Sequence, residues 1–242
     1  MIEHLDDAES GLPTVARQTP WPQLERLDLS PGNEHVVEAV RGRETGYLVL
    51  SGDLRLAPAG LEVTAPAALR CPVGAAHNLR AGPEGARTIA IGVQSQASGG
   101  AFAAEPFARD RLAWRDAIHG GGGRIATRHL WGPDDFGSSW TFVDHAILAQ
   151  GSSLGCHYHD HMDEMFVVLS GRGWMTISNT THEIGPGHVT FQAANEDHGL
   201  YNPYAEDLDF VRVAVATPGQ TFTTIDLDDD LRARRPAPET TT

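Results

Sequence analysis

Cysteine is scarce in this chain of 242 residues, which contains only Cys71 and Cys156. A small disulfide scaffold needs several bridges, so disulfides are not expected to hold this fold together. The sequence also lacks any apolar run of about 18 residues, the length that a membrane-spanning helix needs. Its first residues, MIEHLDDAES, lack the basic segment and apolar segment of a secretory signal. We therefore expect a soluble cytoplasmic protein.

Positive charge is also in short supply. Lysine and arginine total 18 against 32 aspartates and glutamates, which gives a formal net charge of −14. Such a surface repels phosphate backbones and anionic lipid headgroups, and no helix-turn-helix pattern is recognisable. Nucleic acid and membrane surfaces are therefore excluded as expected partners. A small anionic molecule is not excluded, because the field inside a pocket can differ from the net charge.

Helical periodicity is rare, whereas short runs of β-branched and aliphatic residues recur between turn-forming residues. These runs are HVVEAV, YLVLSG, RTIAIGV, TFVDHAIL, MFVVLS, GWMTIS, HVTFQA and DFVRVAVA. The pattern predicts an all-β sandwich or barrel. At roughly 150 residues per domain, the length allows one large or two small domains.

Glycine-rich and polar stretches divide the chain. SQASGGAFAAEP and HGGGGR interrupt the strands midway, and a short helix is expected between them at 106–118. The end of the chain is acidic and proline-rich, which predicts flexibility. The expected parts are an N-terminal barrel at 1–94, a linker with a helix at 95–124, a C-terminal barrel at 125–227 and a flexible tail at 228–242.

An internal repeat relates the two halves. A shift of 119 residues places YLVLSG at 47–52 on FVVLSG at 166–171 and Gly32 on Gly151. A looser pair follows, because CPVGAAH ends at His77 and FQAANEDH ends at His198. The common register predicts a duplicated β unit.

One stretch of the second half, GSSLGCHYHDHMDEMFVVLSG, combines histidines with carboxylates. His157 and His159 are two residues apart, so a strand would present both imidazoles on one face. Glu164 follows just before an apolar run, and His198 precedes a later strand. A barrel would bring the four together, and such a set suits a divalent transition ion. The simpler alternative is a histidine-rich polar loop.

The spacing of this stretch resembles the first motif of the cupin superfamily. That motif is carried here by Gly151, His157, His159, Glu164 and Gly171.

The second cupin motif is similar to the pattern of Gly187, His198 and Asn202. The proline and glycine that usually precede the histidine are replaced by Ala193 and Asn195. Together with the repeat, the resemblance implies a bicupin with two tandem double-stranded β-helix (jelly-roll) barrels. It also implies four metal ligands, which are His157, His159, Glu164 and His198. The ion would be one divalent transition metal per chain: Fe(II), Zn, Mn, Ni or Co.

The first half should hold no ion. The repeat places Glu38, Val40 and Thr45 at the ligand positions, with Glu44 one residue out of register, and keeps only His77. Valine cannot coordinate a metal. We expect a structural barrel in which His77 is an ordinary hydrogen-bonded histidine, although a polar pocket formed with His35 is an alternative.

Further residues are candidates for the site. His161 continues the alternate series after His159, as an alternative ligand, as a proton carrier or as an exposed loop residue. Arg212 interrupts an apolar strand and needs a carboxylate partner, from a substrate or from the protein. Tyr201 is a catalytic candidate, although packing is the alternative for it and for Trp174. Cys156 is expected to be a buried inert thiol.

Two longer segments carry further expectations. Phe166 and Val168 share parity with Glu164 and should line the barrel, whereas Met165, Val167 and Leu169 should face the other side. A strand that is apolar on both faces predicts cover by a second sheet or by a partner, such as the other subunit of a homodimer. The aromatic segment LWGPDDFGSSW at 130–140 either covers a pocket or joins the two barrels.

Three functions fit these observations. The first is an Fe(II)-dependent oxygenase, in which substrate and dioxygen take the open coordination positions. The second is a redox-neutral Zn, Mn or Ni enzyme, namely an isomerase, cyclase, lyase or hydrazine-forming enzyme. The third is a non-enzymatic small-molecule binding protein. A metal-dependent oxygenase is the first expectation, with a small organic metabolite of specialised metabolism, a carboxylate or an amine, as substrate. Glu164, His161, Arg212 and Tyr201 are its predicted catalytic residues.

Overall fold

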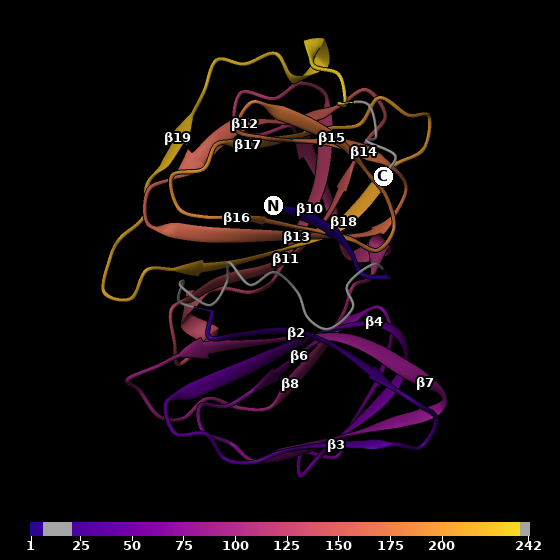
Figure 1. Cartoon of the computed structure of the whole chain (residues 1–242), viewed down its shortest axis with the longest axis vertical. Helices are drawn as coiled ribbons and strands as arrows, with labels where there is room; N and C mark the ends of the chain where they lie inside the picture. The colour runs from indigo at the N-terminus through magenta and orange to yellow at the C-terminus, as the bar shows by residue number, and fades with distance from the viewer. Residues whose placement is uncertain (7–20, 238–242) are drawn as a thin grey trace. The chain divides into compact units, whose positions relative to one another are not determined.

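The computed structural model describes residues 1–6 and 21–237, and its regular structure is almost entirely β-strand (Figure 1). The predicted all-β class is confirmed. The chain divides into two compact units, each with its own strands. Among the described residues, the N-terminal barrel comprises 21–108 and 130–141, and the C-terminal barrel comprises 1–6, 109–129 and 142–237. No helix in the described part of the chain is long and apolar enough to cross a membrane.

One antiparallel sheet forms the wall of the N-terminal barrel. Its strand order is β2-β7-β4-β6-β8, with β3 paired to β7 and β5 paired to β4. The strands are β2 Gln23–Leu29, β3 Glu34–Val37, β4 Arg43–Ala57, β5 Leu61–Thr64, β6 Ala67–Cys71, β7 His77–Gln94 and β8 Ala103–Pro106. Tyr47, Leu56, Leu69 and Leu79 are among the apolar residues that fill its interior.

Two sheets face each other in the C-terminal barrel. The larger has the order β1-β16-β13-β18-β11-β10-β9, and the smaller has the order β15-β14-β17-β12-β19. The strands of the larger sheet are β1 Ile2–His4, β9 Ala113–Asp116, β10 Arg124–Trp131, β11 Trp140–Leu148, β13 Met162–Ser170, β16 His188–Gln192 and β18 Leu208–Ala216. Those of the smaller sheet are β12 Ser153–His159, β14 Gly173–Ile177, β15 Thr180–Ile184, β17 His198–Tyr201 and β19 Thr224–Asp226.

The sequence repeat reappears in the strand topology. In the N-terminal barrel β4 lies between β6 and β7, and in the C-terminal barrel its counterpart β13 lies between β16 and β18. The correspondence extends one strand further, because β8 pairs with β6 where β1 pairs with β16. The first strand of the chain therefore completes the sheet of the C-terminal barrel, and Figure 1 shows the indigo β1 among its orange strands. The predicted pair of tandem jelly-roll barrels is confirmed.

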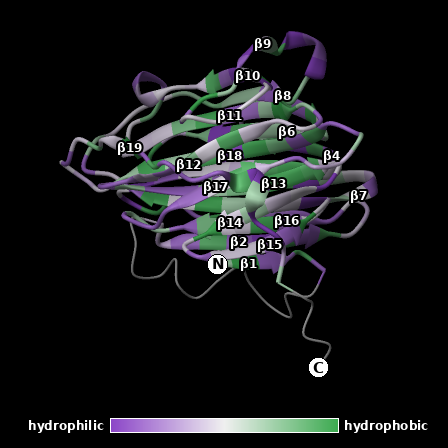
Figure 2. Cartoon of the chain, turned by 90° about the horizontal axis from the view of Figure 1, so that it is seen from above, coloured by the Kyte–Doolittle hydropathy of each residue, from purple (hydrophilic) through white to green (hydrophobic). Residues whose placement is uncertain are grey.

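Alternating side chains of β13 fill the C-terminal barrel. Phe166 and Val168 join its interior core, as their parity predicts. Met165 and Val167 on the opposite face are also buried, and Leu169 is half-buried. Figure 2 shows hydrophobic residues, in green, along the other strands of the molecule as well. Glu164, near the start of β13, is the polar member of a buried face that otherwise consists of Met162, Phe166 and Val168.

Glycine is required where the repeated motif ends. Gly52 and Gly171 occupy equivalent positions and have φ values of 76° and 77°. A Cβ atom on Gly171 would lie 2.1 Å from the carbonyl oxygen of Asp207, and one on Gly52 would lie 1.9 Å from that of Gly85. Both the left-handed backbone and the close approach exclude a side chain. The glycine that marks the motif is thus a requirement of the turn after β13 and, inside β4, of the irregularity where the pairing register shifts between Gly52 and Leu54.

Two local expectations differ from the structure. The helix expected at 106–118 is reduced to the 3₁₀ turn η2, Arg109–Arg111, followed by strand β9. Three residues cannot sustain the cooperative hydrogen bonding of an α-helix. The tail expected to be flexible from 228 packs on the C-terminal barrel as far as Ala237, whose amide donates to the carbonyl of Thr181 at 2.9 Å. Leu231, in the turn η4 Leu231–Ala233, is 3% exposed and holds this segment in place. Residues 238–242 lie outside the described residues.

Candidate metal centre

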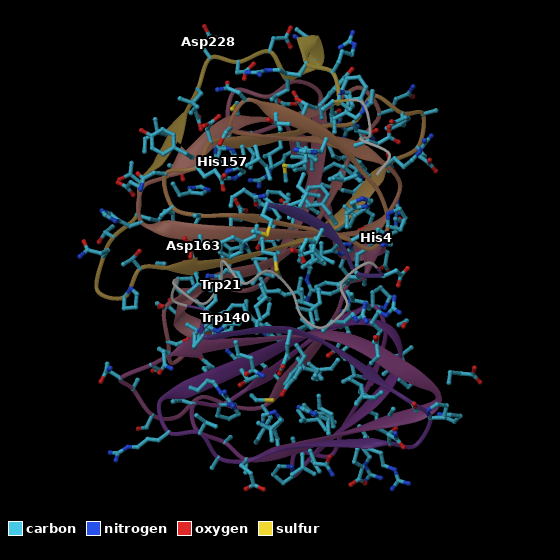
Figure 3. All side chains as sticks on the ribbon, viewed as in Figure 1. His4, Trp21, Trp140, His157, Asp163 and Asp228 are labelled. Atoms are coloured by element: carbon cyan, nitrogen blue, oxygen red, sulfur yellow. The ribbon has the colours of Figure 1, made fainter. Side chains whose placement is uncertain are left out.

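Four side chains converge inside the C-terminal barrel. His157 and His159 lie on β12, Glu164 lies near the start of β13, and His198 begins β17. One ligand atom from each lies within 4.8 Å of the others, and all four residues are buried. Figure 3 marks His157 among the strands of this barrel. The structure therefore brings together the four residues that the sequence pattern predicts as metal ligands.

Each imidazole is held through its Nδ1 atom. His157 Nδ1 lies 2.8 Å from the carbonyl oxygen of Gly155, and His198 Nδ1 lies 3.0 Å from that of Glu196. A carbonyl can only accept, so both Nδ1 atoms carry the proton and both Nε2 atoms present lone pairs to the centre. His159 Nδ1 lies 2.9 Å from Thr224 Oγ1 on β19. Such contacts fix the tautomer and orientation of metal-binding histidines.

The inward atoms form a set of electron donors. Glu164 Oε2 lies 3.0 Å from His198 Nε2, 3.3 Å from His159 Nε2 and 4.0 Å from His157 Nε2. With Nδ1 protonated, the Nε2 lone pairs of His157 and His198 face a carboxylate oxygen, which is a repulsive arrangement unless a cation lies between them. Three nitrogens and one carboxylate oxygen suit a borderline divalent ion. The donor set fits the metal that the motif implies.

Protonation of these residues agrees with that fit. Burial, followed by the positive charge that His198 can carry, lowers the pKa of His157 to about 2. Its imidazole is therefore neutral at physiological pH, as metal binding requires. Burial alone would raise the pKa of Glu164, but hydrogen bonds donated by protonated Nε2 atoms of His159 and His198 and the charge of Arg212 hold it well below the usual range. Such protonation of Nε2 is the metal-free alternative to a cation placed between the lone pairs and the carboxylate. The site therefore presents the neutral imidazole of His157 beside an ionised carboxylate.

A row of charged groups crosses the larger sheet beside Glu164. Arg212 on β18 places Nη1 3.7 Å from Glu164 Oε1 and donates through Nη2 to Asp144 Oδ2 on β11 at 2.8 Å. Asp144 Oδ1 in turn lies 2.5 Å from Nδ1 of His129 on β10. Arg212 and Asp144 are buried, whereas the His129 side chain is 71% exposed. The row Glu164–Arg212–Asp144–His129 thus runs from the buried centre to solvent. Arg212 therefore forms an ion pair with a carboxylate of the protein, that of Asp144, which is one of the two roles predicted for it.

His119 is a neighbour of the centre that sequence reasoning missed. Its ring stacks on that of His157 with centroids 3.9 Å apart, and its Nδ1 lies 2.8 Å from Asp226 Oδ1 on β19. Two glycines allow this approach, because a Cβ on Gly155 would lie 1.7 Å from the His119 carbonyl and one on Gly121 would lie 2.0 Å from the Ser153 carbonyl. The sequence predicts a linker at the run HGGGG. A histidine followed by consecutive glycines, which allow close approach of the backbone, is the feature that could have indicated His119 as a neighbour of the centre.

Two of the predicted catalytic residues lie elsewhere. His161 is exposed in the turn between β12 and β13 and does not belong to the cluster. Tyr201 follows Leu200, a residue of the barrel interior, so its side chain points to the outer face. There it packs edge-on against Trp174, with centroids 5.7 Å apart. We assign neither residue to the site. Cys156 is buried and free, and burial raises the pKa of its thiol to about 11, which agrees with an inert role.

The N-terminal barrel has different side chains at the corresponding positions. Glu38 and Val40 are exposed, and Thr45 is buried where Glu164 would lie. His77 Nε2 lies 2.6 Å from the hydroxyl of Tyr47, and its Nδ1 lies 2.9 Å from the carbonyl of Ala75. His77 is thus an ordinary hydrogen-bonded residue of this barrel. Within the described residues, the only group of three or more ligand-type side chains close enough to hold a metal is the one in the C-terminal barrel.

Glu44 and the aromatic segment at 130–140 contact each other within the N-terminal barrel. The buried Glu44 carboxylate accepts hydrogen bonds from the Gly137 amide at 3.0 Å and from the Ser138 hydroxyl at 2.7 Å. The Arg70 guanidinium lies 5.4 Å from the ring centroid of Trp131 and 5.5 Å from that of Phe136. The segment is therefore packed against this barrel by a buried carboxylate and a cation–π contact.

Comparisons with known proteins agree with this architecture. The Cupin domain family matches residues 144–214. An oxalate-binding protein of Thermotoga maritima is 28% identical over 98 residues, which is 40% of this chain and 81% of that protein.

Solved structures resemble a larger part of the chain. AerE from Microcystis aeruginosa has a TM-score of 0.60 at 12% identity, with 79% of this chain and 86% of that chain covered. A variant of oxalate decarboxylase from Bacillus subtilis has a TM-score of 0.59 at 14% identity and covers 94% of this chain and 79% of its own. At these identities the likeness concerns the fold. The domain match assigns residues 144–214 to a cupin domain, and the repeated topology and the solved structures show that the chain has a two-barrel fold similar to that of bicupins.

Proposed function

We propose that this protein is a divalent-metal-dependent enzyme that acts on a small carboxylate, with the metal held by His157, His159, Glu164 and His198. One observation carries the proposal: four buried donors converge with their supporting hydrogen bonds already made. A divalent ion bound there would supply Lewis acidity and open coordination positions for an outside molecule.

The charges around the centre favour an anionic substrate. Glu164 and Asp144 carry one negative charge each, and Arg212 carries one positive charge. With neutral imidazoles, a divalent ion makes this buried region positive, and it attracts a carboxylate although the whole chain is acidic. The relative from Thermotoga maritima, an oxalate-binding protein, supports the same class of ligand.

The chain's own residues would position such a substrate. Arg212 keeps positive charge beside Glu164 and is itself fixed by Asp144, so its guanidinium need not reorganise when an anion arrives. Phe142 lies 5.3 Å from that guanidinium, and Phe222 packs edge-on against His159 with centroids 6.0 Å apart. These rings exclude water from the two sides of the centre and strengthen its electrostatic interactions.

Among reaction classes, we propose an Fe(II)-dependent oxygenase. Four protein ligands leave two positions on a six-coordinate ion, which a substrate carboxylate and dioxygen can share. A second candidate is a non-enzymatic carboxylate-binding protein, which the name of the Thermotoga maritima relative favours.

The test combines metal analysis with oxygen uptake. The full chain is purified without added metal, analysed for its elements and reconstituted anaerobically with Fe(II), Mn(II) or Zn(II). Carboxylates are then supplied while oxygen consumption is recorded. Substrate-linked oxygen uptake with Fe(II) supports the oxygenase, whereas turnover without oxygen selects redox-neutral chemistry. Carboxylate binding without turnover selects the binding protein, and a chain that takes up no metal overturns the proposal.

A further inference from the structure

We propose that Gln192 is a specificity-determining contact of this site, and that it selects a carboxylate carrying a neighbouring hydroxyl group, an α-hydroxy acid. The inference rests on the proposed function, because it names the substrate class of the same centre.

Gln192 lies directly beside the metal ligands. It ends strand β16, and its Cα pairs with that of Glu164 in the antiparallel register between β13 and β16. Directly opposed residues share a face of the sheet, with Cβ atoms about 5 Å apart. Since Glu164 points into the centre, Gln192 points there as well. Arg212 reaches Glu164 from β18 on the other side, so Gln192 and Arg212 flank that carboxylate.

The Gln192 amide is buried without a partner. The residue is 1% exposed, and neither Oε1 nor Nε2 makes a hydrogen bond within residues 1–6 and 21–237. A buried polar group without a hydrogen bond destabilises a protein, so an amide at this position is expected to have a partner in the functional state. Of the nearby groups, His159 is engaged by Thr224 and Asp144 by Arg212, whereas Glu164 Oε1 and Arg212 Nε also lack a hydrogen bond within the described residues. Glu164 Oε1 can only accept, so it can serve Nε2 of Gln192 but not Oε1, and Arg212 lies on β18, on the other side of β13. The donor that we assign to Oε1 is therefore the molecule that enters the centre.

The chemistry of the amide defines what that molecule offers. Nε2 donates and needs an acceptor, which a carboxylate oxygen supplies, whereas Oε1 accepts and needs a donor. An ionised carboxylate has no donor, so a second group must provide it. A hydroxyl does so without charge. An ammonium group would add positive charge beside the metal and Arg212, which is unfavourable in a buried site. An α-hydroxy acid meets both requirements.

The experiment compares two matched probes, glycolate and acetate, which differ by one hydroxyl. Their dissociation constants are measured by isothermal titration calorimetry on the Mn(II)-loaded full chain, first for the wild type and then for Gln192→Leu. Glycolate can also chelate the metal, but chelation contributes equally in both proteins. The ratio of the two constants therefore isolates the amide. We expect the preference for glycolate to fall about tenfold in the variant, equivalent to about 1.4 kcal/mol.

Thr190→Val is the matched control. Thr190 is buried on the same face of β16, two residues before Gln192, where it pairs with Phe166. Its hydroxyl also lacks a partner within the described part of the chain. Its removal should leave the ratio unchanged. Gln192→Met is a second variant of similar shape, and Mn(II) content and the melting temperature are checked for each protein.

The outcomes separate the two proposals. If both carboxylates bind but the ratio is equal in wild type and Gln192→Leu, the role of Gln192 is wrong and the proposed function stands. If the wild type binds neither carboxylate, both proposals fail. If Gln192→Leu and Gln192→Met lose the metal, Gln192 supports the ion instead of the ligand, and the inference is overturned.

Discussion

The three imidazoles of the centre are supported in two different ways. His157 and His198 bond to backbone carbonyl oxygens, which no substitution of a side chain removes. His159 instead depends on the hydroxyl of Thr224, a half-buried residue on β19. His159 is therefore the ligand whose orientation a single mutation can loosen.

Thr224→Val should weaken metal binding about 10- to 100-fold, because the ring of His159 loses the partner that orients it. Competition with a chromophoric chelator measures the change. Thr223→Val is the control, since Thr223 is exposed and its backbone, not its side chain, bonds with Asp160. Equal affinities in the two variants would show that Thr224 does not orient the ligand.

His198→Ala should abolish stoichiometric metal binding, since it removes one of the four converging donors. His161→Ala and His77→Ala should retain the ion, because His161 is exposed outside the cluster and His77 bonds within the N-terminal barrel. Elemental analysis after gel filtration measures the content. Loss of the metal from His77→Ala would contradict the assignment of the N-terminal barrel as structural.

The stability that the His129–Asp144 ion pair contributes to the fold should depend on pH. The hydrogen bond with Asp144 raises the pKa of His129 above its ordinary value, against burial and the charges of Arg212 and Arg115. A raised pKa stabilises the fold fully below the unfolded value of about 6.5, and the contribution is lost as pH rises through the folded pKa. Urea unfolding should therefore show wild-type stability declining above about pH 6.5. His129→Gln should flatten that decline, and parallel curves would exclude the ion pair.

The sequence predicted which four side chains converge in the C-terminal barrel, but not their neighbours. Fixed spacings identified His157, His159 and Glu164, because their relation is local to two adjacent strands. Asp144, Gln192 and His119 come from other parts of the chain and reach the centre only through strand pairing and a glycine-lined approach. Tyr201 lies three residues after His198 on β17, so strand alternation gives it the opposite parity, and its ring packs on Trp174 instead.

At the level of elements, β1 is the least expected strand. The sequence assigned its residues to the first barrel, yet it pairs with β16 and its neighbour Leu5 is 2% exposed. The apolar runs predicted which segments become strands, whereas strand order depends on long-range pairing that composition does not encode. The strand covers the edge of β16, which also carries Gln192.

Leu5→Ala should destabilise the C-terminal barrel by about 2–3 kcal/mol, within the range for truncation of a buried leucine. The backbone bond from the Leu5 amide to the Gly187 carbonyl, at 2.9 Å, remains possible in the variant. Glu3→Ala, in the middle of β1 and half-buried, is the control with an expected change below about 1 kcal/mol. Urea denaturation followed by circular dichroism compares them, and equal midpoints would show that Leu5 does not anchor the strand.

At the scale of the whole molecule, the two barrels should respond differently to metal. A ligand that binds only the folded state stabilises it by about 2.7 kcal/mol at a concentration 100 times its dissociation constant. Since the candidate ligands all belong to the C-terminal barrel, Mn(II) should raise the calorimetric transition of that unit and leave the other unchanged. His157→Ala should remove the shift. A metal-dependent shift that survives this substitution would indicate a second binding site.

The pairing of β1 with β16 also constrains how the protein is made. On the ribosome the first strand is synthesised long before its partner at His188–Gln192, and at 5–20 residues per second the delay is on the order of ten seconds or more. The nascent chain must keep that short segment available while the N-terminal barrel forms. The residues of β1 are therefore among the last to reach their native position, although they are translated long before their partner strand.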